Sequence, residues 1–302
     1  NVLRLEGGMG NQLFQYAFAR NLSNKFGGVI LFDLRSLRLD DLRDVSINNF
    51  NINQKIAKLK PTNFEKFIIF YARYKYFFFK VLDSIQKEFI STKLLIFFGI
   101  YLQRSTVYKD YKKKSIFPIR YISGNFMSEK YFIEAKHIIC NEFKIKKLSL
   151  SSNINLMSKI SQENSICVHI RRGDYLNSKW SNQLLVCNNI YYNNAINELS
   201  KLIDNPIFFI FSNSPKDIRW IKNNYIFDEN VNFINFKNDD IGDFDLMINF
   251  KHFILSNSSY SWWASYLSKH IDKKIVAPSK WNNNIYNMDA IYLNDWILIN
   301  VD

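Results

Sequence analysis

Apolar residues in the second half of the chain fall into short runs that alternate with amphipathic stretches. The near-continuous apolar runs predict strands at 165–170, 207–212, 231–235, 252–256 and 274–279. The stretches between them predict helices near 190–203, 215–224, 243–250 and 259–269. Strands without a polar face, joined by helices, are typical of a parallel sheet that is covered on both sides. We therefore expect a doubly wound α/β domain, whose ligands bind beyond the carboxyl ends of the strands.

The first 34 residues show a similar alternation. They predict a strand, a glycine loop, an amphipathic helix and a second strand at 2–6, 7–10, 11–25 and 28–33. This order is the beginning of a βαβ unit. From Phe64 to Gln103, aromatic residues and lysines interleave over a helical length. Two interpretations of that segment remain open: one or two helices packed in a domain core with lysines at the rim, or an amphipathic surface that rests on a membrane.

Length and charge refine this picture. A chain of 302 residues predicts two domains, which we place at 1–155 and 156–302. The net charge of +13 comes from the first half, because residues 55–147 hold 20 basic and 7 acidic side chains. Residues 151–302 are nearly neutral, which disfavours a protein that binds nucleic acid along its whole length.

Cysteines and apolar runs bear on the compartment. Cys140, Cys167 and Cys187 form no CxxC pair and have no histidine nearby at metal-ligand spacing. This odd number predicts free thiols in a reducing compartment. The longest apolar run, from Leu94 to Leu102, is far shorter than the roughly 20 residues that span a bilayer. No signal peptide is visible, so we expect a soluble or peripheral protein of the cytoplasm.

Charged residues follow the first predicted strand of the second half, at the edge where ligands bind. The segment reads His169-Ile-Arg-Arg-Gly-Asp-Tyr175, in which Arg171 and Arg172 are candidates to hold a phosphate. Asp174 is placed to orient one arginine, and Gly173 permits a tight turn. The alternative is a surface cluster of salt bridges in a loop.

Small polar residues follow two other strands. Ser212 and Asn213 are candidates to hydrogen-bond a base or a ribose, whereas Ser214 is placed to cap the next helix. Asn257-Ser-Ser-Tyr-Ser-Trp-Trp263 opens a helix, whose N-terminus can bind an anion. This segment lacks the glycines of dinucleotide-binding and P-loop motifs, which disfavours both classes.

Three weaker signals remain. Tyr260 is a candidate to lie against a base or a sugar. Gly7-Gly-Met-Gly-Asn-Gln12 links a strand to a helix, and its glycines allow a ligand close to the backbone, opposite the Arg171 loop across a cleft. Asp243-Phe-Asp245 is similar to a DxD metal site, but acidic residues in a first helical turn explain it as well, and we favour that reading.

Five motifs in order carry a family resemblance. They are Gly7-Gly-Met-Gly-Asn-Gln-Leu-Phe-Gln-Tyr-Ala-Phe18, His169-Ile-Arg-Arg-Gly-Asp-Tyr175, Leu246-Met247 with Lys251-His252, Asn257-Ser-Ser-Tyr-Ser-Trp-Trp263 and Val276-Ala-Pro-Ser-Lys-Trp281. Over residues 1–34 and about 165–302, the chain resembles the bacterial α-1,2-fucosyltransferases of glycosyltransferase family 11. The resemblance implies a GT-B-type α/β architecture of two Rossmann-like domains with GDP-fucose in the cleft between them. The basic aromatic segment would then be a helical insertion in the first domain.

The resemblance also implies residue roles. Arg171 would hold the β-phosphate of GDP and stabilise the leaving group, so no metal and no other cofactor is expected. The donor site would contain Gly8, Gly10, Asn11, Gln12, His169, Arg171, Arg172, Asp174, Tyr175, Ser212, Asn213, Asp243, Asn257, Ser258, Ser259 and Tyr260. Candidates to orient the acceptor hydroxyl are Asn11, His169, Asp174 and Glu6. Asn213 and Ser214 stand where the family often has two aspartates. If an aspartate there binds guanine or ribose, Asn213 can replace only some of its hydrogen bonds, because its side chain is uncharged.

We therefore expect an inverting enzyme that transfers L-fucose from GDP-β-L-fucose to the 2-hydroxyl of a galactoside, in the synthesis of a surface polysaccharide such as O-antigen. Its expected partners are a galactose-terminated oligosaccharide, free or lipid-linked, and the inner face of the cytoplasmic membrane through residues 64–104, but no nucleic acid. Three alternatives remain open: transfer of another GDP-hexose such as GDP-L-galactose, a nucleic-acid-binding protein that uses the basic segment, and a catalytically silent sugar- or lipid-binding module.

Overall fold

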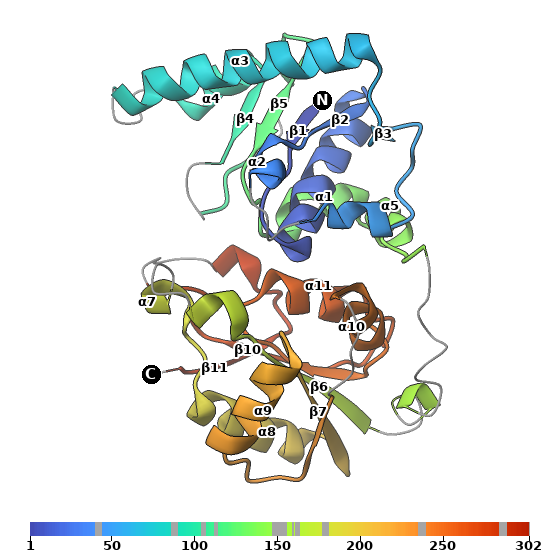
Figure 1. Cartoon of the computed structure of the whole chain (residues 1–302), viewed down its shortest axis with the longest axis vertical. Coiled ribbons are helices and arrows are strands. Elements are labelled where there is room, and N and C mark those ends of the chain that lie inside the picture. The colour runs from blue at the N-terminus through green and yellow to red at the C-terminus, as the bar shows by residue number, and fades with distance from the viewer. Residues whose placement is uncertain are drawn as a thin grey trace. The chain divides into compact units, whose positions relative to one another are not determined.

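The chain folds into two compact units, which we describe separately (Figure 1). The computed structural model describes residues 1–39, 44–85, 90–103, 107–111, 114–146, 156–158, 160, 164–176, 181–234, 240–283 and 289–301. The N-terminal unit comprises Asn1–Lys146 with Asp289–Ile291, and the C-terminal unit comprises Lys147–Met288 with Tyr292–Asp302. The domain boundary expected after residue 155 falls at the edge of a stretch outside the described residues and stays a prediction.

The N-terminal unit is built on a five-stranded parallel sheet with the strand order β3-β2-β1-β5-β4. Its strands are β1 (Val2–Arg4), β2 (Ile30–Asp33), β3 (Ala57–Lys58), β4 (Ile100–Leu102) and β5 (Tyr121–Ser123). Its helices are α1 (Met9–Phe26), α2 (Arg35–Arg38), α3 (Asn63–Ile85), α4 (Thr92–Phe97) and α5 (Lys136–Glu142), with 3₁₀ turns at Ser46–Asn49, Glu129–Tyr131 and Ile133–Ala135. The βαβ beginning is thus confirmed. The basic segment carries the expected helices, but it also supplies β3, β4 and β5, which the sequence analysis missed.

Helices α1 and α3 cover opposite faces of this sheet. They contact Phe32 and Leu31, successive residues of β2 whose side chains point to opposite sides. On one face, Tyr16 of α1 stacks on Phe32, with 6.4 Å between ring centroids. On the other face, α3 buries its inner side chains against Val2 and Leu31 in one hydrophobic cluster. Figure 1 shows α3 as the long helix at the outer side of the unit. Both helices therefore belong to the folded unit.

Asp33 ends β2 and links this sheet to α3. Its buried carboxylate accepts hydrogen bonds from Arg73 Nε at 2.8 Å, from Arg73 Nη2 at 2.6 Å and from the Tyr121 hydroxyl at 2.8 Å. Burial acts to raise the pKa of Asp33, but these hydrogen bonds and the charge of Arg73 hold that pKa below its ordinary value. Since Arg73 lies on α3, the ion pair fixes the rotation of that helix on the sheet.

The C-terminal unit is built on a six-stranded parallel sheet with the strand order β11-β10-β9-β6-β7-β8. Its strands are β6 (Asn164–Ile170), β7 (Pro206–Ser212), β8 (Val231–Phe233), β9 (His252–Ile254), β10 (Ile275–Pro278) and β11 (Ile297–Ile299). Its helices are α7 (Ser181–Leu184), α8 (Asn189–Leu202), α9 (Pro215–Asn224), α10 (Asp240–Met247) and α11 (Ser259–Leu267), with a 3₁₀ turn at Gly173–Leu176. A further 3₁₀ turn, Asp289–Ile291, is grouped with the N-terminal unit. The predicted doubly wound domain is confirmed, and the sequence analysis missed β11 and α7.

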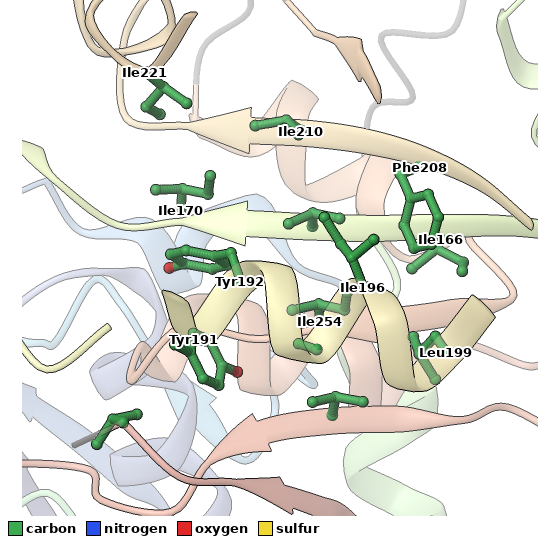
Figure 2. Close-up of a cluster of buried hydrophobic side chains, with 14 of the residues drawn as sticks. Ile166, Ile170, Tyr191, Tyr192, Ile196, Leu199, Phe208, Ile210, Ile221 and Ile254 are labelled. Carbon is green, nitrogen blue, oxygen red and sulfur yellow. The ribbon is translucent and has the colours of Figure 1, made fainter. Parts of the chain in front are cut away.

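Helix α8 packs on one face of the second sheet (Figure 2). Ile166, Ile170, Phe208 and Ile210 point from the strands towards it, and all are buried. Two tyrosines of α8 add polar contacts at the carboxyl edge of the sheet: the Tyr191 hydroxyl donates to the Leu255 carbonyl at 2.5 Å, and the Tyr192 hydroxyl donates to the His169 carbonyl at 3.3 Å. The helix thus holds the ends of the strands that precede the candidate loops.

Neither unit offers a membrane span within the described residues, since none of their helices is long and apolar enough to cross a bilayer.

We expect Asp33→Asn to lower the free energy of unfolding of the N-terminal unit by about 2 kcal/mol at neutral pH, because Arg73 would lose its charged partner. The depressed pKa of Asp33 means that its contribution is complete above the ordinary aspartate pKa of about 4 and is lost as the pH falls below it. Urea unfolding should therefore show a difference between wild type and variant that narrows as the pH falls through this window.

The matched control is Asp44→Asn, which changes an exposed aspartate of the same unit. A stability difference for Asp33→Asn that did not vary with pH would contradict the role of its charge.

Candidate functional site

Arg171 lies directly after β6, at the carboxyl edge of the C-terminal sheet. Its Nη2 donates to Asp174 Oδ1 at 2.7 Å, and its guanidinium carbon lies 5.4 Å from the centroid of the Tyr175 ring. The side chain is 19% exposed, and its buried Nε has no hydrogen-bond partner among the described residues. Arg172 Nε is also buried without a hydrogen-bond partner in the described part of the chain, so the exposure of Arg171 is the feature that suits it to bind an anion. The predicted ion pair with Asp174 is confirmed, and Asp174 orients Arg171.

Arg172 is packed inside the unit. Its guanidinium stacks on Trp220, with 3.2 Å from the guanidinium carbon to the ring centroid, and its Nε lies 3.6 Å from Asp217 Oδ1. The side chain is 11% exposed. Because Trp220 and Asp217 both lie on α9, the side chain of Arg172 anchors the loop to that helix. The structure therefore separates the two arginines: Arg172 is enclosed by α9, and Arg171 is the more exposed of the two.

Asn213 sets the turn that follows the arginines. Its Oδ1 accepts the backbone N–H of Arg172 at 2.8 Å, and the neighbouring Ser212 hydroxyl donates to the Ile170 carbonyl at 2.8 Å. Gly173 has a φ of +39°, and a Cβ at this position would lie 2.8 Å from Asn213 Nδ2. These contacts give Ser212 and Asn213 a role in shaping the arginine loop. Their predicted bonds to base or ribose stay a prediction.

Ser214 is the N-cap of α9, as the sequence predicted. Its Oγ accepts the backbone N–H of Asp217 at 3.2 Å and donates to the carboxylate of the same residue at 2.6 Å. The cap thereby fixes the carboxylate that faces Arg172.

His169 lies at the end of β6 and is buried, with its Nδ1 2.9 Å from Ser256 Oγ. Burial, and secondly the charge of Arg171, lower the pKa of His169 to about 3. The imidazole is therefore neutral near pH 7 and a weak base. Its contact with Ser256 ties the end of β6 to the loop that follows β9.

Asn257 joins three loops at the same edge. Its Nδ2 donates to the carbonyls of Leu184 and Trp281, at 2.9 Å each, and its own carbonyl accepts the Tyr175 hydroxyl at 2.9 Å. The residue is buried, so the side chain serves as an internal clamp. Its hydrogen bond holds the Tyr175 ring beside Arg171.

Helix α11 begins immediately after Ser258, whose side chain makes no capping hydrogen bond with the helix. Ser258 is buried, and Ser259 is half-buried in the first turn. The backbone N–H groups of a first helical turn and its dipole favour an anion, and the anion site at this helix start stays a prediction.

Tyr260 is occupied by contacts within the unit. Its hydroxyl donates to the Asp240 carbonyl at 2.6 Å, and its ring centroid lies 5.7 Å from that of His169 and 5.2 Å from that of Phe244. Burial, and secondly the nearby carboxylate of Asp243, raise the pKa of Tyr260, so its hydroxyl stays a donor. The described residues contain no group of three or more His, Cys, Asp or Glu that could hold a metal, and Asp243 is part of no such group.

The glycine loop belongs to the N-terminal unit. Gly8 is the N-cap of α1, Gly10 and Asn11 lie in the first helical turn, and a Cβ on Gly7 would lie 2.7 Å from Asn11 Nδ2. Gln12 is buried, and its Nε2 donates to the carbonyl of Gly7 at 3.0 Å.

Gln12 and Glu6 each make a further contact within the N-terminal unit. Gln12 Nε2 also donates to the Asp44 carbonyl at 2.7 Å, so its predicted contact with the donor competes with a structural role. Glu6, a candidate to orient the acceptor, is ion-paired with Arg4 at 3.0 Å. Each half of the predicted site thus forms an ordered loop within its own unit.

Comparison with known proteins decides the family. The model of glycosyl transferase family 11 matches residues 2–300. The chain belongs to this family. An α-1,2-colitosyltransferase of Escherichia coli is 32% identical over 293 residues, covering 93% of this chain and 91% of that protein. The O-antigen biosynthesis glycosyltransferase WbnK of Escherichia coli is 27% identical over 313 residues, covering 97% of this chain and 98% of that protein.

A solved structure supports the architecture. The fucosyltransferase NodZ from Bradyrhizobium matches with a TM-score of 0.51 at 13% identity, covering 90% of this chain and 94% of NodZ. A second structure of NodZ, an α-1,6-fucosyltransferase soaked with GDP-fucose, matches with a TM-score of 0.50 at 13% identity, covering 88% of this chain and 91% of NodZ. Together with two parallel sheets covered by helices, this likeness shows the GT-B-type fold of the family 11 chain.

The sequence analysis missed three residues that contact Arg172 and His169. Trp220 and Asp217 contact Arg172, and Ser256 contacts His169. The pattern of apolar residues at 215–224 predicted only a helix. The contacts of Trp220 and Asp217 with Arg172 depend on how that helix packs on the sheet.

We expect Gly173→Ala to lower the free energy of unfolding by about 1–2 kcal/mol, because the new Cβ meets both an unfavourable φ and the amide of Asn213. Gly27→Ala is the matched control, since Gly27 has a φ of +72° but no atom within 4 Å of an added Cβ. Urea unfolding of both variants separates backbone strain from the clash. Equal losses would show that the Asn213 contact has no effect.

Proposed function

We propose that this family 11 enzyme transfers L-fucose from GDP-β-L-fucose to the 2-hydroxyl of a galactoside, with inversion at the anomeric carbon. The observation that carries the proposal is Arg171, an arginine at the carboxyl edge of a Rossmann-like sheet that Asp174 orients and whose side chain is 19% exposed. Support also comes from the relatives, since one carries out α-1,2 transfer of colitose and NodZ has been soaked with GDP-fucose. Ligands of such sheets bind at this edge.

In this proposal the acceptor oxygen attacks the anomeric carbon as the bond to the β-phosphate oxygen breaks. The electron pair of the broken bond remains on GDP, and the acceptor proton is released to a base or to water. Arg171 is the catalytic residue that stabilises the charge on the departing phosphate, and Asp174 holds its guanidinium in place. The first turn of α11, with Ser258 and Ser259, adds backbone N–H groups for the diphosphate.

A guanidinium supplies the positive charge that a divalent metal supplies in other nucleotide-sugar transferases, so we propose a metal-independent reaction. Activity that persists in EDTA after exhaustive metal removal would agree with this. Among the residues considered for the acceptor proton, His169 is a weak base with a pKa of about 3. Asp174 and Glu6 carry carboxylates that are already ion-paired.

We propose a galactose-terminated oligosaccharide of a surface polysaccharide as the acceptor, held on a lipid carrier at the cytoplasmic face of the membrane. The relative WbnK acts in O-antigen biosynthesis, and this supports the class of acceptor.

We expect Arg171→Ala to lower turnover with GDP-fucose and a galactoside at least 100-fold, because one positioned donor to a developing oxyanion contributes about that factor. Arg219→Ala, at an exposed arginine of α9, should leave turnover unchanged. Initial rates of GDP release and of product formation measure both variants. Near wild-type turnover of Arg171→Ala would contradict the assigned role.

Transfer of colitose is a second candidate, because the relative at 32% identity uses that sugar. Colitose is L-fucose without its 3-hydroxyl, so the two donors differ in one hydrogen-bonding group. A site that binds the 3-hydroxyl rejects the deoxy sugar strongly, whereas a site that does not bind it accepts both. We expect competition between GDP-fucose and GDP-colitose, read by product mass, to yield mainly the fucosylated product. A mainly colitosylated product would contradict this expectation and identify GDP-colitose as the preferred donor.

A further inference from the structure

Helix α3 has an inner face that is fully engaged by the N-terminal unit. Ile69, Ala72 and Tyr76 are buried against the sheet, and the Tyr76 ring stacks on Tyr121 with 4.6 Å between centroids. Lys75 Nζ donates to two backbone carbonyls, those of Phe98 at 2.8 Å and Ile119 at 3.2 Å. With Arg73 paired to Asp33, the inner face holds the helix in one orientation.

The outer face of α3 is apolar, which reverses the usual pattern of a surface helix. Its large exposed side chains are Phe64, Phe67, Phe70, Tyr71, Tyr74, Phe77, Phe78 and Val81. At 3.6 residues per turn these positions share one side of the helix. Phe64 is 73% exposed and Tyr74 is 67% exposed, so the rings are open to solvent along the helix. A contiguous apolar patch of this kind marks an interaction surface.

Positive charge borders this patch. The other exposed side chains between Phe64 and Val81 are Lys66 and Lys80. The single acidic residue of that stretch, Glu65, is hydrogen-bonded to Lys58. Aromatic rings flanked by lysines, without an opposing acidic group, suit an anionic surface that has an apolar layer beneath it.

Helix α4 packs beside one end of α3 and also exposes apolar side chains. Phe79 of α3 contacts Phe98, with 5.0 Å between centroids. On α4 itself, Leu94 and Phe97 are each 46% exposed, and Lys93 is exposed beside them. Both helices of the 64–104 segment thus expose aromatic or apolar side chains and lysines; residues 86–89 and 104 lie outside the described part.

We propose that the outer face of α3, together with Leu94 and Phe97 of α4, docks on an anionic lipid bilayer, with α3 lying along the membrane surface. The aromatic rings enter the headgroup layer, and Lys66, Lys80 and Lys93 contact lipid phosphates. A second copy of the chain fits this face less well, since a symmetric pair would bring the bordering lysines of both copies together. The inference extends the proposed function, and its test measures vesicle binding rather than activity.

The experiment is co-sedimentation of the full chain with vesicles of phosphatidylcholine alone or mixed with phosphatidylglycerol. We expect wild type to bind the mixed vesicles at least 10-fold more tightly than the neutral ones. The triple variant Phe70→Ser, Tyr74→Ser, Phe77→Ser should lose at least 10-fold in affinity for the mixed vesicles. The triple variant Lys66→Gln, Lys80→Gln, Lys93→Gln should lose most of the preference for phosphatidylglycerol.

Matched controls come from the C-terminal unit. They are Ile190→Ser with Ile226→Ser and Ile271→Ser, and Lys201→Gln with Lys216→Gln and Lys269→Gln, all at exposed positions. Both control variants should bind as wild type does. Urea unfolding of every variant confirms that the fold is kept, since all substituted side chains are exposed.

Three results would overturn the proposal. They are no binding of wild type to mixed vesicles, equal binding to neutral and mixed vesicles, and a dimer in sedimentation velocity that only the aromatic variant dissociates. Loss of vesicle binding with unchanged transfer to a soluble galactoside would leave the proposed function in place. Conversely, vesicle binding by an inactive Arg171→Ala variant would support the surface without the chemistry.

Discussion

The parallel pairing of β6 with β7 determines where the chemistry of the C-terminal unit lies. The register runs from Asn164 opposite Pro206 to Ile170 opposite Ser212, so both strands end at the same level of the sheet. The residue after β7, Asn213, therefore lies within hydrogen-bonding distance of the backbone after β6. A one-residue slip would turn every side chain to the other face and remove this contact. The arginine loop thus depends on the backbone register as much as on the arginines.

Two neighbouring arginines acquire opposite tasks from this arrangement. Arg172 is buried between Trp220 and Asp217, where the aromatic face and the carboxylate offset the cost of removing its charge from water. Arg171 has Asp174 as its carboxylate partner, and its side chain is more exposed than that of Arg172. The more exposed Arg171 is therefore the arginine that the proposed function assigns to the diphosphate.

The periodicity of apolar residues predicted the long strands and helices that bury an apolar face. It could not predict short strands that are stabilised by pairing with neighbouring strands. Strands β6 and β7 are long apolar runs, and both were predicted within one residue. By contrast, β3 has two residues and β5 has three, too few to show alternation. These strands exist because they pair with β1 and β2, which a local pattern does not contain.

The same limit applies to the candidate site. Arg171 and Asp174 are three residues apart, so the sequence alone could predict their ion pair. The contacts of Asn213 with the arginine loop span 41 residues and depend on strand register. The internal bonds of Gln12 and Tyr260 were also invisible, since their partners lie 32 and 20 residues away. Several polar residues of the family motifs therefore shape the loops, and only the packing of the folded chain reveals this.

Polar contacts on the inner face of α3 keep its aromatic side chains on the outside of the N-terminal unit. An amphipathic helix with exposed rings could lower its free energy by turning those rings inwards. Here Arg73 is tied to the buried Asp33, and Lys75 is tied to two carbonyls. A rotation of α3 would break an ion pair and leave a buried carboxylate without its partner, which costs several kcal/mol. The polar contacts on the inner face therefore keep the apolar face outside, where an anionic membrane surface can cover it.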